Sequence, residues 1–184
     1  IDAMEQGIRS AAAQGATFIQ TPEMTGLVQQ ERNAFFEAVK DEANDPVAPA
    51  AARLAAELGV TIHLGSTPIR VGEKMAANRS YLFGRDGSKL ASYDKIHMFD
   101  VTISGAESYR ESAGYRPGGQ AVICQTDVAK IGLTICYDLR FPHLYRDLAY
   151  SGAQIISVPS AFSVTTGQAH WEALLRARAI ETGC

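Results

Sequence analysis

Residues 131–142 read IGLTICYDLRFP, and an apolar run stops there at a single cysteine. The run over residues 131–135 is typical of a buried strand, and Pro142 suits the first turn of a following helix. Cys136 should therefore lie at the carboxyl end of a strand, beside a helix N-terminus. Such a position exposes a thiol to substrate and lowers its pKa. A free cysteine is more often a small buried hydrophobic residue, so this stretch alone leaves both interpretations open.

Two upstream segments have the same form, an apolar run that ends in a reactive side chain. Residues 16–24, ATFIQTPEM, place Glu23 at the end of a predicted strand. Residues 92–100, SYDKIHMFD, place Lys95 between a predicted hairpin and a long loop. An isolated glutamate or lysine is usually a solvated surface charge. Together with the cysteine, however, the two residues form a constellation that indicates a site.

Helical and strand patterns alternate along the rest of the chain. Helices are predicted from the N-terminus to near Gly15, over 45–58, over 141–150 and from about 168; strands are predicted over 16–23, 60–66, 79–83, 89–93, 121–124, 130–135 and 154–158. This alternation is typical of an α/β layered domain, in which sites lie at carboxyl strand ends. Residues 99–119 are predicted to form one long loop, and such loops are often functional.

Composition limits the kind of protein. The chain has 184 residues, 46% hydrophobic side chains and a net charge of -3, which fits one soluble globular domain over residues 1–184. No basic run predicts a nucleic-acid partner, and no apolar stretch approaches the ~20 residues that span a bilayer. The three cysteines and four histidines lack disulfide-framework or zinc spacing, so we expect reduced thiols, no metal and a cytoplasmic location.

Three ordered segments resemble the catalytic segments of the nitrilase superfamily, the carbon-nitrogen hydrolases. They are residues 21–24 (TPEM), 93–97 (YDKIH) and 135–142 (ICYDLRFP). Further segments extend the resemblance over the whole chain and are most similar to the amidase branch that includes deaminated glutathione amidase and omega-amidase. These are residues 159–162 (PSAF), 169–172 (AHWE) and 176–182 (RARAIET). The resemblance implies a four-layer α-β-β-α sandwich, here apparently incomplete at both ends.

Attack on an amide carbonyl requires a nucleophile, a group that accepts and returns its proton, and positive charge at the oxyanion. Cys136, Glu23 and Lys95 are residues of these three types. We expect Lys95 and the helix N-terminus to lower the pKa of Cys136. The resemblance also implies a second carboxylate that assists Glu23. Glu111, within residues 109–112 (YRES), is the preferred candidate, and Glu107 is its competitor.

Tyr137, Arg140 and Phe162 are the candidate substrate-binding residues. Arg140 could hold a substrate carboxylate as a bidentate fork, or pair internally with Asp138 or Glu172. Phe162, like Trp171, could line the pocket or be a core aromatic.

Glu172 could pair with Arg176 four residues on, or support Lys95.

The sequence predicts hydrolysis of a terminal carboxamide in a small carboxylate-bearing substrate, through a thioester on Cys136, with release of ammonia and without a cofactor. The resemblance further implies a homo-oligomer. A nitrilase or an N-carbamoyl amidohydrolase is the alternative within the same superfamily. The residues also leave open a cysteine-histidine hydrolase that uses His143 or His170, the amidase domain of a glutamine-dependent synthetase, and a catalytically inactive binding or scaffold module.

Overall fold

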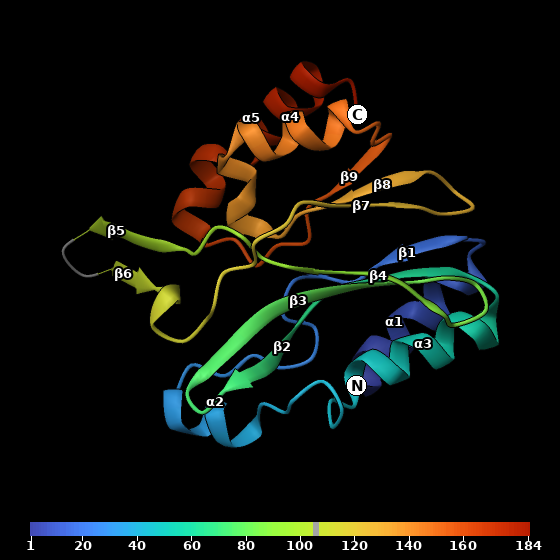
Figure 1. The fold of residues 1–184 in the computed structure, drawn as a ribbon, viewed down its shortest axis with the longest axis horizontal. Helices are drawn as coiled ribbons and strands as arrows, with labels where there is room; N and C mark the ends of the chain where they lie inside the picture. The colour runs from blue at the N-terminus through green and yellow to red at the C-terminus, as the bar shows by residue number, and fades with distance from the viewer. Residues whose placement is uncertain (105–106) are drawn as a thin grey trace.

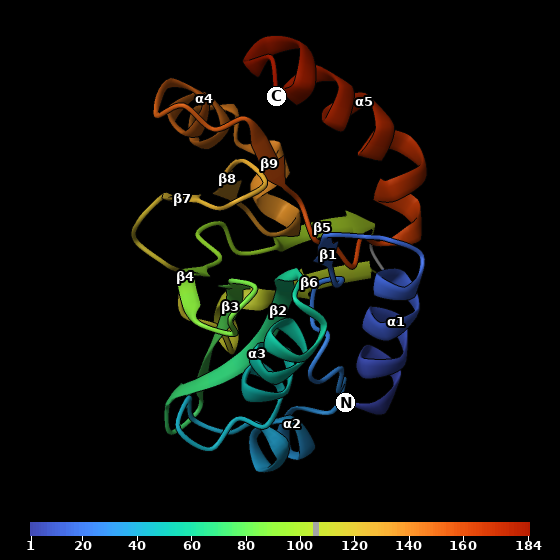
Figure 2. The same ribbon diagram turned by 90° about the vertical axis from the view of Figure 1, so that its right-hand side faces the viewer.

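Two β-sheets form the middle of the molecule, and helices cover the outer face of each (Figures 1 and 2). The structure is a computed structural model that describes residues 1–104 and 107–184, apart from the side chains of Ser104 and Glu107. The layers follow one another as helix, sheet, sheet, helix. The predicted α-β-β-α sandwich is therefore confirmed.

The first helix and sheet layers are built from the N-terminal half of the chain. In chain order the elements are α1 (Asp2–Ala13), β1 (Phe18–Gln20), α2 (Arg32–Ala38), α3 (Val47–Leu58), β2 (Thr61–Gly72), β3 (Met75–Phe83) and β4 (Lys89–Asp94). The strand order is β1-β2-β3-β4, in which β1 and β2 are parallel and the other neighbours antiparallel. Helices α1 and α3 cover this sheet (Figure 1).

The remaining residues supply a separate hairpin and the second pair of layers. Their elements are β5 (Asp100–Ser104), β6 (Glu107–Arg110), the 3-10 helix η1 (Glu111–Ala113), β7 (Val122–Gln125), β8 (Lys130–Leu133), the 3-10 helix η2 (Cys136–Arg140), α4 (Pro142–Tyr150), β9 (Ile155–Ser157) and α5 (Val164–Thr182). The second sheet has the order β7-β8-β9, with β8 parallel to β9. Helices α4 and α5 lie on its outer side (Figure 1).

Buried apolar clusters join the layers. Ile8 of α1 and Leu54 of α3 pack with Ile62 of β2 in the core beneath the first sheet. Tyr93 of β4 belongs to a second cluster with Ile131 of β8, which holds the two sheets together. Each such buried side chain contributes ~1.5–3 kcal/mol relative to an exposed one. Sheet packing therefore fixes the residues that follow β4 close to those that follow β8.

Local sequence signals located several boundaries correctly. Helix α3 ends at Gly59, which adopts the left-handed conformation (φ 63°) that glycine tolerates best. Pro142 occupies the first turn of α4, as predicted. The hairpin around residues 85–87 joins β3 to β4.

The prediction of one long loop over residues 99–119 is wrong, because this segment contains the β5–β6 hairpin and η1. The hairpin is held by backbone pairing, for example Val101 with Tyr109, and the alternation of apolar Val101 and Ile103 with polar neighbours is the signal that the prediction missed. Helix α2 was not predicted. Helix α5 begins at Val164, earlier than expected, because Ser163 caps a first turn of poor helix formers by accepting from the Thr166 N–H at 3.3 Å.

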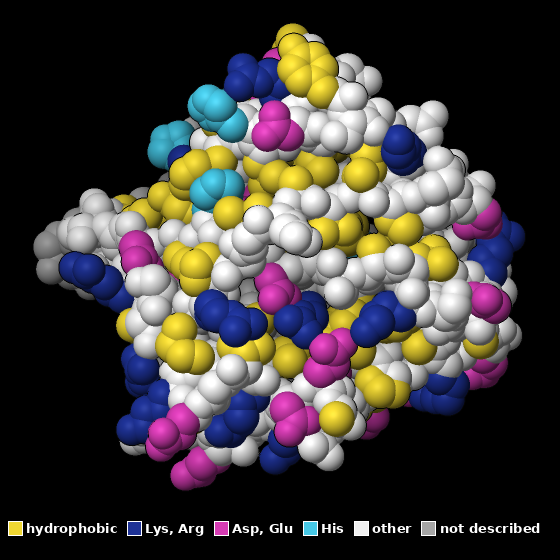
Figure 3. Space-filling model, viewed as in Figure 1, with side chains coloured by type: hydrophobic (Ala, Val, Ile, Leu, Met, Phe, Trp, Pro, Cys, Tyr) yellow, Lys and Arg dark blue, Asp and Glu magenta, His cyan; other side chains and the backbone are white. Residues whose placement is uncertain are grey.

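Charged side chains of both signs are interspersed over the face shown in Figure 3. Among the described residues, none of the helices combines the length and the apolar character that crossing a membrane requires.

Candidate active site

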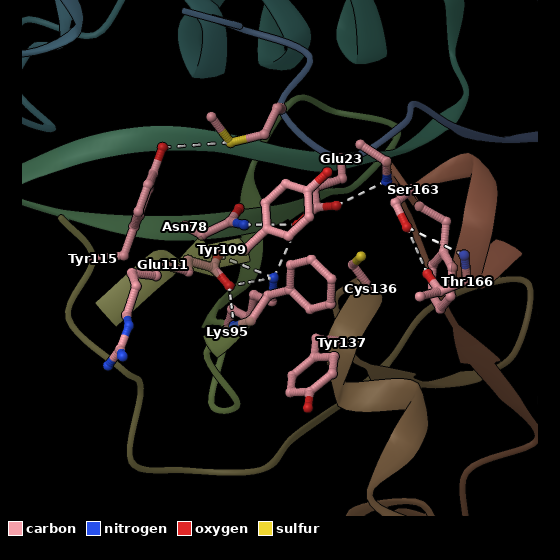
Figure 4. A pocket seen from close by; sticks show the side chains of 15 residues that line it. Glu23, Asn78, Lys95, Tyr109, Glu111, Tyr115, Cys136, Tyr137, Ser163 and Thr166 are labelled. Atoms are coloured by element: carbon pink, nitrogen blue, oxygen red, sulfur yellow. Dashed lines mark hydrogen bonds and ion pairs between the residues drawn. The ribbon is translucent and has the colours of Figure 1, made fainter. Parts of the chain in front are cut away.

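A cavity of about 430 Å³ lies where the ends of both sheets meet the β5–β6 hairpin (Figure 4). Its wall is assembled from the loop after β1, strand β3, the segment after β4, the hairpin, η2 and the start of α5. The lining includes the four residues expected to be catalytic, namely Glu23, Lys95, Glu111 and Cys136. Segments far apart in sequence thus bring these side chains to one space.

Glu23 lies three residues beyond β1 and is buried at the cavity wall. Its Oε1 accepts from Asn78 Nδ2 at 2.9 Å and from Lys95 Nζ at 3.3 Å. Its Oε2 accepts from the backbone N–H of Ala161 at 2.8 Å. Three donors from three different segments therefore fix the orientation of the carboxylate.

Lys95 follows β4 and is only 2% exposed. Its ammonium lies between two carboxylates, because Nζ also donates to Glu111 Oε1 at 3.0 Å and Oε2 at 2.9 Å. Burial alone would lower the pKa of Lys95, but the charges of Glu23 and Glu111 outweigh it and raise that pKa. The lysine therefore stays protonated, as a stabiliser of negative charge must.

Glu111 opens η1 directly after the hairpin. Its Oε2 also accepts the backbone N–H of Phe99 at 2.6 Å, so the carboxylate joins the hairpin to the segment that follows Lys95. The side chain of Glu107, the competing candidate, lies outside the described residues. The structure thus places Glu111 against Lys95, whose ammonium also contacts Glu23.

Cys136 begins η2 with a left-handed backbone conformation, φ 48°, which is strained for a residue other than glycine. Its backbone N–H donates to Pro159 O at 3.0 Å, and its sulfur is turned toward Glu23 (Figure 4). Strain of this kind is concentrated at functional sites.

The expectation that the pKa of Cys136 is lowered is wrong. Burial raises the pKa of this thiol, and the negative charge of Glu23 adds to the increase, while Lys95 only partly opposes it. Cys136 itself begins a five-residue 3-10 helix that precedes α4, so the α-helix N-terminus does not begin at the sulfur. The resting site therefore holds Cys136 as a thiol, and the thiolate must be generated by proton transfer.

Asp138 anchors the turn that carries Cys136, a role the sequence did not reveal. This fully buried carboxylate accepts from Ile135 N at 2.9 Å, Tyr93 Oη at 2.7 Å, His97 N at 3.0 Å and His97 Nδ1 at 2.7 Å. His97 in turn stacks on Phe141, with ring centroids 3.6 Å apart. The lysine and cysteine segments are thus tied together two residues from each reactive group.

The candidate substrate-binding residues divide into two groups. Tyr137 and Phe162 line the cavity, whereas Arg140 is not among its lining residues. The Arg140 guanidinium lies 5.9 Å from the Tyr137 ring centroid and 5.6 Å from that of Phe162, and Nη2 is 3.3 Å from His170 Nδ1. Arg110, which the sequence did not single out, lines the cavity instead.

Neither internal pairing considered for Arg140, with Asp138 or with Glu172, is formed in the described part of the chain. Asp138 is occupied by the donors described above, and Glu172 pairs with Arg176 at 3.1 Å on the surface of α5. Trp171 packs edge-on against Phe162 at a centroid distance of 4.9 Å and is not among the residues that line the cavity.

Neither His143 nor His170, the histidines considered as bases, lines the cavity. Within the described residues, the His, Cys, Asp and Glu side chains form no group of three or more arranged to hold a metal ion.

A four-layer sandwich with a glutamate, a lysine and a cysteine at one cavity defines a class of hydrolases. The family model for carbon-nitrogen hydrolases matches residues 1–184, and the chain belongs to this family. It is 41% identical over 184 residues to deaminated glutathione amidase of Yersinia enterocolitica, covering 98% of this chain and 64% of that protein. It is 35% identical to human omega-amidase NIT2, covering 95% of this chain and 62% of that protein.

Solved structures show the same fold. The NitFhit protein of C. elegans matches 100% of this chain and 45% of its own, with a TM-score of 0.90 and 32% identity. An amidase from Nesterenkonia sp. matches 99% of this chain and 65% of its own, with a TM-score of 0.81 and 28% identity. The chain therefore spans less than two thirds of the length of these relatives.

Proposed function

We propose that the protein hydrolyses a terminal carboxamide of a small carboxylate-bearing substrate, through a thioester on Cys136, with release of ammonia. The observation that carries this proposal is the buried lysine held between Glu23 and Glu111 beside a cysteine in one cavity. Amidase names among the relatives support the same reaction.

In the first step, Glu23 accepts the thiol proton as the Cys136 sulfur attacks the amide carbon. The raised pKa of the thiol means that proton transfer accompanies attack rather than preceding it. The carbonyl oxygen becomes an oxyanion, which Lys95 and the backbone N–H of Tyr137 stabilise. Removing one such donor typically costs ~10²–10³ in rate.

In the second step, Glu23 returns the proton to the leaving nitrogen, the carbon-nitrogen bond breaks and ammonia departs. A water molecule then attacks the thioester while Glu23 accepts one of its protons. Collapse of this second intermediate releases the carboxylic acid, and the proton returns to the sulfur. Glu111 keeps Lys95 in place throughout, since it contacts the ammonium with both oxygens.

The substrate class rests on resemblance and on the charges of the cavity. Deaminated glutathione is the first candidate and ω-amides of the α-ketoglutaramate type are the second, in line with the names of the relatives. Only the second carries a terminal carboxamide and releases ammonia; deaminated glutathione has secondary amides, so the same steps on it would release an amine in place of ammonia. Arg110 replaces Arg140 as the side chain we propose for the substrate carboxylate, because it lines the cavity. Nitriles and N-carbamoyl compounds remain the alternative substrates.

We also propose that the enzyme is a cytoplasmic homo-oligomer. The resemblance to its family supports the oligomer, and the three cysteines, all in the described part of the chain and all free, fit a reducing compartment. Light scattering after size-exclusion chromatography tests the oligomeric state. Fractionation of the source cells tests the cytoplasmic location.

Mass spectrometry during turnover of an amide tests the mechanism. We expect an acyl adduct on Cys136 and no turnover by Cys136→Ala, and turnover that survived this substitution would remove the assignment. A panel of α-keto amides, nitriles and N-carbamoyl compounds, each assayed for ammonia, together with deaminated glutathione assayed for the released amine, tests the substrate class. Nitrile turnover above that of every amide would overturn the amidase proposal, and failure of every compound would favour an inactive binding module.

A further inference from the structure

Asn78 on β3 contacts both the proposed base and the proposed oxyanion donor. Its side chain donates to Glu23 Oε1 at 2.9 Å, and its backbone carbonyl accepts the N–H of Lys95 at 3.0 Å. The residue is 2% exposed and lies at the cavity wall (Figure 4). Strand β3 therefore aligns the segments that carry Glu23 and Lys95 through one residue.

The oxygen of the Asn78 amide lacks the hydrogen bond that a buried polar atom normally makes. Its Oδ1 is buried without a hydrogen-bond partner among the described residues. A buried acceptor without a donor costs ~1–3 kcal/mol. The amide cannot relieve this by rotating, since Oδ1 would then face the Glu23 carboxylate, which offers only lone pairs. Asn78 is thus held in an orientation that favours Glu23 at the expense of its own hydrogen bonding.

The donors around Glu23 are distributed unequally between its two oxygens. Oε1 accepts from both Asn78 and Lys95, whereas Oε2 accepts only from Ala161 N among the described donors. A carboxylate offers roughly two lone-pair sites on each oxygen. The remaining site is therefore on Oε2, where a proton from Cys136 can be placed.

We propose that Asn78 is a positioning residue for the general base: it occupies Glu23 Oε1, keeps the carboxylate ionised and leaves Oε2 to take the proton of Cys136. This inference rests on the function proposed above. It assigns to Asn78 an effect on how readily Glu23 accepts a proton, because a hydrogen bond to the ionised form of a carboxylate opposes its protonation.

Two substitutions separate this role from a structural one. Asn78→Leu removes the donor and keeps the branching of the side chain, and Asn78→Asp keeps the shape but places a second carboxylate against Oε1. We expect both to lower kcat by about tenfold or more with a small change in KM. Both should move the acid limb of the pH–rate profile to higher pH, and Asn78→Asp should move it further. A purely structural role predicts the reverse order, because aspartate preserves the shape of asparagine better than leucine does.

Ser80→Ala is the matched control, since Ser80 lies two residues along the same strand and its hydroxyl is 2.6 Å from buried His63 Nε2, away from the cavity. It should change thermal unfolding without moving the acid limb. If Asn78→Leu and Asn78→Asp keep the wild-type acid limb, the proposal is wrong.

Alkylation of Cys136 by acrylamide, followed by mass spectrometry as a function of pH, provides a readout without turnover. If the wild type hydrolyses no amide, the proposed function is wrong, and the role of Asn78 is still tested by alkylation. An alkylation profile that is identical in wild type and Asn78→Asp would contradict the role of Asn78, whatever the substrate.

Discussion

Glu23 and Asp138 are both buried carboxylates that follow closely on a strand end, yet their surroundings differ. Asp138 is enclosed and accepts from four donors, three of which belong to β4 or to the segment that follows it. Glu23 accepts from three donors, borders the cavity and lies beside a lysine. A carboxylate whose lone pairs are all occupied can hold a turn, whereas one with a free site can also exchange a proton.

The comparison predicts that the two carboxylates fail in different ways when altered. Loss of the Glu23 charge should reduce chemistry more than stability, and loss of the Asp138 charge should do the opposite. The substitutions below test this contrast, from the largest expected effect to the smallest.

Glu23→Gln should lower kcat by ~10²–10⁴, since it removes the group that accepts and returns the proton. Ammonia release under saturating amide measures this loss, and thermal unfolding should show that the fold persists. In the same variant the pKa of Cys136 should fall relative to the wild type, because the Glu23 charge that adds to its increase is gone, and alkylation of Cys136 followed against pH measures this shift. A kcat close to that of the wild type would show that Glu23 is not the base.

Lys95→Met should lower kcat by at least ~10² while leaving the affinity for an unreactive amide analogue nearly unchanged, because the oxyanion is absent from the ground state. Single-turnover rates and calorimetric binding measure the two quantities. A loss of affinity with a normal maximal rate would contradict the role of Lys95 and assign it to substrate binding.

Asp138→Asn should lower the free energy of unfolding by ~2–3 kcal/mol, because an amide cannot accept from every donor that now meets the carboxylate. Denaturant titration of the variant against the wild type measures this difference. The comparison between the two carboxylates would fail if Asp138→Asn proved less destabilising than Glu23→Gln.

Glu111→Gln should have the smallest effect on stability of these changes and should shift the acid limb of the pH–rate profile. The amide oxygen can still accept from Lys95 and Phe99, but the amide nitrogen replaces Oε1, which lies 3.0 Å from the Lys95 ammonium, and the charge beside the lysine is lost. Glu107→Gln is the control. A normal profile in Glu111→Gln together with a lost activity in Glu107→Gln would reverse the choice of second carboxylate.

Local signals in the sequence were sufficient for the fold class. Gly59 ends α3 and Pro142 begins α4 because each requires or forbids a backbone conformation within its own turn. Apolar runs and alternation located the strands of both sheets because these patterns, too, are contained within each short segment. The three segments around Glu23, Lys95 and Cys136 were recognisable because the reactive residue follows a strand in each case.

Tertiary structure alone decided how those residues are supported. Asn78 and Ala161 N orient Glu23 from segments more than fifty residues away, a relation that no local pattern contains. Arg140 was expected at the substrate and lies against aromatic rings instead. The pKa of Cys136 rises because packing buries the sulfur, and burial depends on which distant segments meet around it. Sequence thus indicated the candidate reactive groups, and the packing of two sheets determined the burial and the contacts of each one.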